Sequence, residues 1–222
     1  MKKFLILIGV IALFTQACVE DLPKSSKKIP GWQAERQNDY MKFACSAPFN
    51  AGSVMGVLIH LECAHRGLIE PIPDGSVPEN AWDAIFKKLY NLEDTSDFNV
   101  NHLINLLYAF EGDPAIAAGL RTKIEEALLN FKYWFADPTP DRTNDKGEKV
   151  VDMMWYWSEN HVLLFRSAEY LAGQRYPEKV FAVSGMTGRE HMERARAEIM
   201  QWLDERGRFG FTEWHSDVYY NW

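Results

Sequence analysis

The chain has 222 residues and a formal net charge of −7, with 24 Lys and Arg against 31 Asp and Glu. Its 47% of hydrophobic residues exclude a disordered or collagen-like chain. The acidic balance, with no long basic run, argues against nucleic acid as a partner. We therefore expect one acidic globular domain.

The first 17 residues have the form of a secretory signal peptide. Two lysines precede the apolar run 4–14, which is too short to span a bilayer comfortably. The segment Thr15-Gln16-Ala17-Cys18 resembles a bacterial lipobox, although Thr15 stands where that pattern prefers Leu. We expect cleavage before Cys18, lipidation of Cys18 and a tether over residues 18–30 that anchors the domain 31–222 to a membrane. Cleavage followed by free secretion is the alternative.

Two further cysteines remain if Cys18 is acylated. Cys45 and Cys63 could form a disulfide in an exported protein, provided that their Cα atoms lie within about 7 Å of each other. Two unpaired buried thiols are the other possibility. The chain has no CxxC pair, no Cys/His cluster with zinc-like spacing and no nucleotide-binding motif, so we expect neither a metal site nor a cofactor.

Apolar residues recur at helical spacing through most of the chain, with short polar breaks between the stripes. Ser158 is placed to serve as the N-cap of one later helix, and Thr187 with Glu190 has the form of a capping box before another helix, which we expect to end at Gly207. About seven helices and no strand pattern predict an all-α fold of helical hairpins. The earlier apolar stripes cover residues 54–61, 82–89, 100–110 and 116–135.

An unusually long connection, residues 136–157, precedes the helix that begins near Ser158. It ends in Met153-Met154-Trp155-Tyr156-Trp157, which is too apolar to lie entirely in water. Long connections in a compact domain are often functional. We expect this ending either to pack or to line a site.

Polar side chains with catalytic potential gather at the start of that helix. Glu159, Asn160 and His161 place an acid, an amide and an imidazole within one turn. A helix N-terminus disfavours the imidazolium form, which would leave His161 available as a neutral base. The alternative is a set of capping residues beside a hydrogen-bonded core histidine.

A second polar and aromatic cluster lies near the end of the chain. It could present a base, an acid and a ring that stacks on sugars, or it could be an aromatic plug with capping groups. Its members are Glu213, Trp214, His215, Tyr219 and Tyr220.

Together the two clusters resemble the (α/α)-toroid polysaccharide lyases and their relatives, which include alginate-lyase-like and heparinase-like proteins. The resemblance covers about residues 153–222 and implies a partial (α/α) toroid, an N-terminal portion of such a fold with an open helix face that a partner would cover. It also implies β-elimination on a uronate-containing polysaccharide. In that scheme Asn160 neutralises the uronate carboxylate, His161 is the base, and Tyr219 or Tyr220 donates the proton.

Other side chains complete the expected site, and two other functions stay open. We expect Arg166 to supply a local cation for an acidic glycan. Glu159 with Glu213 or Asp217 would suit a glycoside hydrolase instead. A non-catalytic glycan-binding lipoprotein would use only the aromatic platform. The residues expected to contact sugar rings are Trp155, Trp157, Trp214 and His215.

Overall fold

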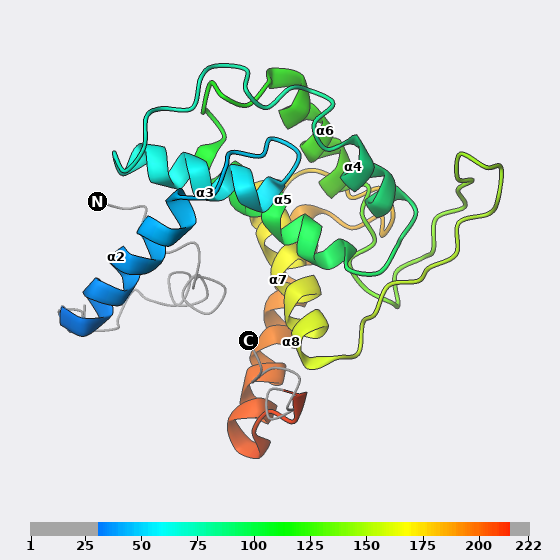
Figure 1. Ribbon diagram of the computed structural model, residues 1–222. Coiled ribbons are helices and arrows are strands. Elements are labelled where there is room, and N and C mark those ends of the chain that lie inside the picture. Colours follow the sequence, from blue (N-terminus) through cyan, green and yellow to red (C-terminus); the bar gives the residue numbers. More distant parts are fainter. Residues whose placement is uncertain (1–30, 214–222) are drawn as a thin grey trace. The chain divides into compact units, whose positions relative to one another are not determined.

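The structure is a computed structural model that describes residues 31–213 (Figure 1). This part of the chain contains three isolated β-bridges and no strand, so the predicted all-α class is confirmed. None of its helices is long and apolar enough to cross a membrane. The helices are α2 (Gly31–Cys45), α3 (Val54–His65), α4 (Asp83–Tyr90), α5 (Ser96–Phe110), α6 (Ala118–Leu129), α7 (Glu159–Arg175) and α8 (Gly188–Phe209).

The described chain divides into two compact units. The first comprises residues 31–81 and 105–120, and the second comprises residues 82–104 and 121–213. Helix α5 contributes its residues up to Ile104 to the second unit and the remainder to the first. All candidate site residues that the structure describes belong to the second unit.

The first unit is held by α3 and by a covalent link to α2. Ser53 caps α3, because its side chain accepts a hydrogen bond from the N–H of Gly56. Cys45 and Cys63 form a disulfide with a Cα–Cα distance of 5.9 Å, which decides between the two possibilities that the sequence left open. Both cysteines lie on helices, at the end of α2 and near the end of α3.

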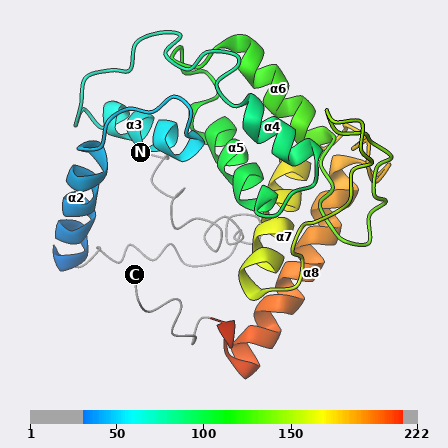
Figure 2. The same cartoon turned by 45° about the vertical axis from the view of Figure 1, so that its right-hand side comes forward.

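The second unit is built around an antiparallel pair of helices, α7 and α8, which lie side by side in both views (Figures 1 and 2). The pair approaches closely at Gly173 and Gly188. A Cβ atom on Gly173 would lie 2.3 Å from the carbonyl oxygen of Gly188, so only glycine allows this approach. The predicted capping box of Thr187 and Glu190 is present at the start of α8.

The core of the second unit is strongly aromatic. Tyr156 stacks on Phe165 of α7, with ring centroids 4.5 Å apart, and Phe131 stacks on the same ring. Phe165 is fully buried. The apolar stripe that the sequence predicts for α7 therefore faces the core.

The sequence misses one helix, and two of the helix ends that it predicts are wrong. Helix α2 was not predicted, because only its Ala44 is buried and it shows no apolar stripe. Helix α6 ends at Leu129 instead of continuing through residue 135, since the carbonyls of Leu128 and Leu129 accept hydrogen bonds from the Tyr133 hydroxyl and from the N–H of Ala182 instead of from a further helical turn. Helix α8 passes Gly207 and ends before Gly210, whose φ of 76° lies in the left-handed region.

Candidate functional site

The first turn of α7 is capped from a distant segment. Ser158 occupies the N-cap position, but its hydroxyl donates to the side-chain oxygen of Asn160 at 2.6 Å and makes no cap hydrogen bond. The carboxylate of Glu213 accepts the backbone N–H of Asn160 instead, at 3.1 Å. A negative charge at this helix end also interacts favourably with the helix dipole. The expected capping role of Ser158 is thus taken by Glu213.

Glu159 completes the link between the two clusters. Its carboxylate accepts the backbone N–H groups of Thr212 and Glu213 at 3.0 and 2.9 Å, and it pairs with Arg206 of α8 at 2.6 Å. The two clusters that the sequence singled out therefore meet as far as Glu213. Trp214, His215, Tyr219 and Tyr220 lie outside the described residues, as does Cys18.

His161 pairs with an acid that the sequence analysis did not select. Its Nδ1 lies 2.8 Å from Oδ2 of Asp97, in the first turn of α5. The side chain of Asp97 is 1% exposed and that of His161 is 12% exposed. The ring of Phe98 meets the imidazole edge-on, with centroids 5.5 Å apart. Two short contacts therefore fix the plane of the imidazole.

The pairing with Asp97 settles which imidazole nitrogen can act. A carboxylate accepts a hydrogen bond from Nδ1–H, which leaves the lone pair of the neutral ring on Nε2. The imidazole of His161 makes no other hydrogen bond to the described residues. This is the arrangement in which a buried carboxylate orients a histidine that serves as a base.

Burial raises the pKa of the Asp97 carboxyl, and the attraction and hydrogen bond of His161 oppose that rise. Its second oxygen, Oδ1, is buried without a hydrogen-bond partner among the described residues. A structural carboxylate usually has both oxygens satisfied. Asp97 is therefore held in a place that costs stability, which is common at functional sites.

A tight loop between α4 and α5 positions Asp97. Leu92 and Thr95 both have positive φ angles, 54° and 63°, which is unfavourable for residues with a Cβ. The loop is tied down because Lys88 donates to the hydroxyl of Thr95 at 2.5 Å and the hydroxyl of Ser96 donates to the carbonyl of Glu93 at 2.6 Å. Asp97 follows directly, so its side chain has little freedom to turn away from His161.

Asn160 is oriented so that its amide nitrogen is available. Its side-chain oxygen accepts from the hydroxyl of Ser158 and from the backbone N–H of His161, at 2.6 and 2.8 Å. The NH₂ group makes no hydrogen bond to the described residues. The first turn of α7 thus offers two amide donors beside an imidazole acceptor.

The segment before Ser158 alternates between the core and solvent. Met154 and Tyr156 are buried, whereas the exposed fractions of Trp155 and Trp157 are 50% and 70%. The two indole rings lie 5.2 Å apart at an angle of 30°. The expectation that this segment packs is confirmed for Met154 and Tyr156, and its other side presents exposed aromatic faces.

Arg166 does not lie where a substrate cation would be needed. It is 2% exposed, its guanidinium lies 3.7 Å from the ring centroid of Trp134, and it donates to Glu169 at 2.7 Å. Glu169 is itself buried and also accepts from His191 and Arg194. Arg166 is therefore part of a buried network between α7 and α8, and we leave it out of the site.

That network contains a second arrangement that resembles catalytic machinery. Ser184 Oγ lies 2.6 Å from His191 Nε2, and His191 Nδ1 lies 2.8 Å from Glu169. A serine nucleophile also needs backbone donors for the oxyanion. The neighbouring backbone N–H groups already have acceptors. Gly185 donates to the carbonyl of Phe181, and Met186 donates to the hydroxyl of Ser184. Thr187 donates to the carboxylate of Glu190, and Gly188 donates to the carbonyl of Lys179. With His191 1% exposed, this cluster fits a structural role.

Glu159 and Glu213, two acids that a glycoside hydrolase could use, take part in the link between the clusters, and Asp217 lies outside the described residues. Burial raises the pKa of Glu159, but the hydrogen bonds from Thr212, Glu213 and Arg206 outweigh this and leave the pKa below its usual value. A general acid needs a raised pKa to carry its proton near neutral pH. Glu159 is better suited to hold the two segments together than to protonate a leaving group.

In residues 31–213, no group of three or more His, Cys, Asp or Glu side chains is arranged to hold a metal ion. Comparison with protein-family models, with curated proteins and with solved structures gives no match to this chain.

Proposed function

We propose that the protein acts on a uronate-containing polysaccharide by β-elimination, with His161 as the base. The observation that carries this proposal is the pairing of His161 Nδ1 with the buried carboxylate of Asp97, which leaves Nε2 unengaged by the described residues. Asn160, the preceding residue, presents amide donors of the kind that neutralise a carboxylate.

Each proton transfer of the proposed elimination can be assigned to one of these residues. Nε2 of His161 takes the proton from C5 of the uronate, and the freed electron pair forms the double bond between C4 and C5. The bond between C4 and the glycosidic oxygen breaks, and that oxygen takes a proton from Tyr219 or Tyr220. Hydrogen bonds from Asn160 to the uronate carboxylate lower the energy of the charge that develops beside C5.

Aromatic residues next to the first turn of α7 suit a polysaccharide. Trp155 and Trp157 expose two large rings immediately before Ser158, and Phe98 is 36% exposed beside His161. Flat apolar rings with a polar edge pack well against the faces of sugars. We assign the two tryptophans to substrate binding.

We also propose that the protein is exported and anchored through a lipid on Cys18, and that its helices belong to a partial (α/α) toroid with a face for a partner. The disulfide between Cys45 and Cys63 supports export, because disulfides persist in oxidising compartments. Metabolic labelling with a palmitate analogue tests the anchor. Incorporation of the label that is lost in the Cys18→Ser variant would support the lipid anchor. A mature protein that carries no label would indicate secretion.

The proposed reaction is tested by product analysis on the purified protein. Polymannuronate, polygalacturonate and a neutral β-glucan are incubated with it, and near-ultraviolet absorbance and new reducing ends are followed together. Elimination gives both signals in step on a polyuronate, because each cleavage creates one double bond. Reducing ends without absorbance would identify a hydrolase, and binding without either signal would identify a glycan-binding protein. Either of these results would overturn the proposed reaction.

A further inference from the structure

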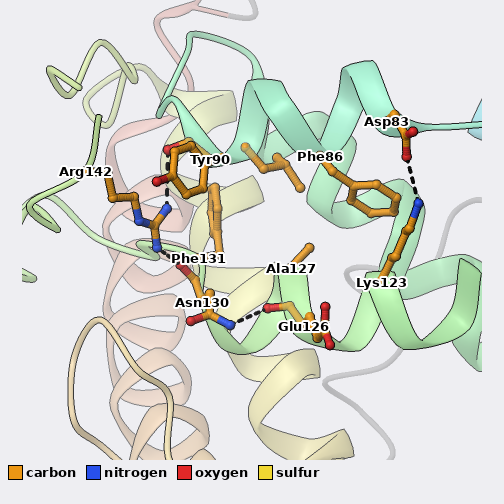
Figure 3. A pocket seen from close by; sticks show the side chains of 10 residues that line it. Asp83, Phe86, Tyr90, Lys123, Glu126, Ala127, Asn130, Phe131 and Arg142 are labelled. Carbon is orange, nitrogen blue, oxygen red and sulfur yellow. Dashed lines mark hydrogen bonds and ion pairs between the residues drawn. The ribbon is translucent and has the colours of Figure 1, made fainter. Parts of the chain in front are cut away.

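A second possible site lies elsewhere in the second unit, between α4 and α6 (Figure 3). It is a cavity of about 480 Å³, within the range of pockets that hold small ligands. Its apolar lining comes from Phe86 and Leu89 of α4, Ala127 of α6 and Phe131 just after α6. Leu89 and Phe131 are almost fully buried and form its floor.

The two ends of the cavity differ in charge. At one end Asp83 and Lys123 form an ion pair at 3.0 Å, so their charges largely cancel. At the other end Arg142 lies beside Tyr90 and Asn130 (Figure 3). Glu126 of α6 also lines the cavity, so the positive charge is confined to the Arg142 end and does not extend over the whole lining.

Arg142 keeps hydrogen-bonding capacity at that end. It donates to the backbone carbonyls of Asn130 at 2.7 Å and Tyr90 at 3.3 Å, and its guanidinium lies 4.8 Å from the centroid of the Tyr90 ring. A guanidinium has five N–H donors, so these two bonds leave others unused. No acidic side chain of the described residues pairs with Arg142.

Partial burial makes an unpaired charge on Arg142 energetically unfavourable. Burial lowers the pKa of Arg142, with Tyr90 acting in the opposite direction, yet an arginine stays protonated in a protein. An anion that entered the cavity would face a cation that has lost part of its hydration. Carboxylates pair with the planar guanidinium through two parallel hydrogen bonds.

We propose that this cavity binds a small aromatic carboxylate, with its ring against the apolar floor and its carboxylate on Arg142. Phe86, Phe131 and Tyr90 line the space, and their rings favour an aromatic body over an aliphatic chain. The proposal does not depend on the reaction assigned to His161, because the two sites share no residue.

Calorimetric titration of the full chain with 3-phenylpropionate and with its uncharged amide, 3-phenylpropanamide, tests the proposal. We expect saturable binding of the acid and binding of the amide that is weaker by about tenfold or more, because the charge-assisted hydrogen bonds are lost. Equal affinity for the acid and the amide would overturn the role of Arg142. Failure of the acid to bind up to its solubility limit would overturn the site.

Two variants locate the binding. Arg142→Gln should weaken binding of the acid but leave binding of the amide nearly unchanged. Since Arg142 also binds the ends of α4 and α6, a second variant, Ala127→Leu, fills the cavity and leaves Arg142 in place. It should abolish binding of both probes, whereas Ala118→Leu, on the same helix outside the cavity, should bind as the wild type does. Unchanged binding in Ala127→Leu would contradict the proposal.

Discussion

Two neighbours of His161 decide what its imidazole can do. Asp97 holds Nδ1, and Phe98 packs against the ring, so the histidine has one orientation and one nitrogen left for chemistry. The sequence placed His161 at a helix start and indicated a base, but it gave no sign of Asp97. The two residues are 64 positions apart, and a pairing over such a distance depends on how α5 meets α7.

Asp97→Asn separates catalysis from stability. The pKa of Asp97 is raised in the folded protein. The stability that its protonated carboxyl contributes is therefore fully present below the unfolded-state pKa of 3.8, and it is lost as the pH rises through the folded-state pKa. At neutral pH the amide removes a buried charge, and we expect the free energy of unfolding to stay level or rise. The rate of elimination should fall by about 10²- to 10⁴-fold, because the amide can stabilise the wrong tautomer.

Urea unfolding and the absorbance assay measure the two effects on the same preparation. Asp204→Asn is the control, since Asp204 forms an exposed ion pair with Arg208 of the same helix and should change neither quantity. Loss of stability together with an unchanged rate would show that Asp97 serves only the fold.

At the scale of the elements, the second unit depends on how closely α7 and α8 pack. Their starts were readable from the sequence, because Ser158 and the Thr187 capping box mark them locally. The end of α8 was not, since Gly207 and Gly210 are both plausible stops and only the backbone angle distinguishes them. The burial of Arg166 had a local signal in Glu169, three residues further along the helix.

Two glycine substitutions should change stability in opposite directions. Gly173→Ala places a Cβ against backbone atoms of Gly188 and Met192 that cannot move aside, and it should cost about 1–3 kcal/mol. Gly207→Ala lies in the same helix pair with open space around its Cβ, and it should add about 0.5–1 kcal/mol through a better helix propensity. Thermal unfolding of both variants checks the signs, and a neutral Gly173→Ala would mean that the helices are not so close.

Glu159 ties the turn at 210–213 to α7, and its effect should depend on pH. Its pKa is lowered, so the stability it contributes is present above the unfolded value of 4.5 and is lost as pH falls through the folded value. We expect Glu159→Gln to cost about 1–2 kcal/mol at neutral pH, from weaker bonds to Arg206 and to two N–H groups.

The difference between this variant and the wild type should shrink as the pH falls below 4.5. Denaturation at a series of pH values measures it. A difference that stays constant across the series would mean that the charge of Glu159 does not matter.

On the scale of the whole molecule, composition and periodicity were sufficient to predict the helical fold class but not the division of the chain into two units. The split into two units crosses α5 and α6, which a search for linkers between helices would not find. Helix α2 was missed because most of its side chains are exposed and periodicity needs a buried stripe. The cysteines allowed two states, and only the fold brings Cys45 to Cys63.

The disulfide should contribute strongly to the first unit. The closed loop spans 18 positions, and in the chain-entropy model such a cross-link adds about 3 kcal/mol. The double variant Cys45→Ser and Cys63→Ser should therefore unfold at a lower urea concentration than the oxidised wild type. Dithiothreitol should lower the urea midpoint of the wild type and leave that of the double variant unchanged. Equal midpoints for oxidised and reduced wild-type protein would contradict this expectation.

The assignment of His161 as the base is tested most directly by chemical rescue. On a polyuronate that product analysis identifies as a substrate, His161→Ala should lower the rate of double-bond formation by about 10²- to 10⁴-fold, and added imidazole should restore part of it by filling the vacated space. His65→Ala, in the first unit, is the control and should keep the wild-type rate. A His161→Ala protein that is folded and as active as the wild type, or one that imidazole does not rescue, would contradict the assignment.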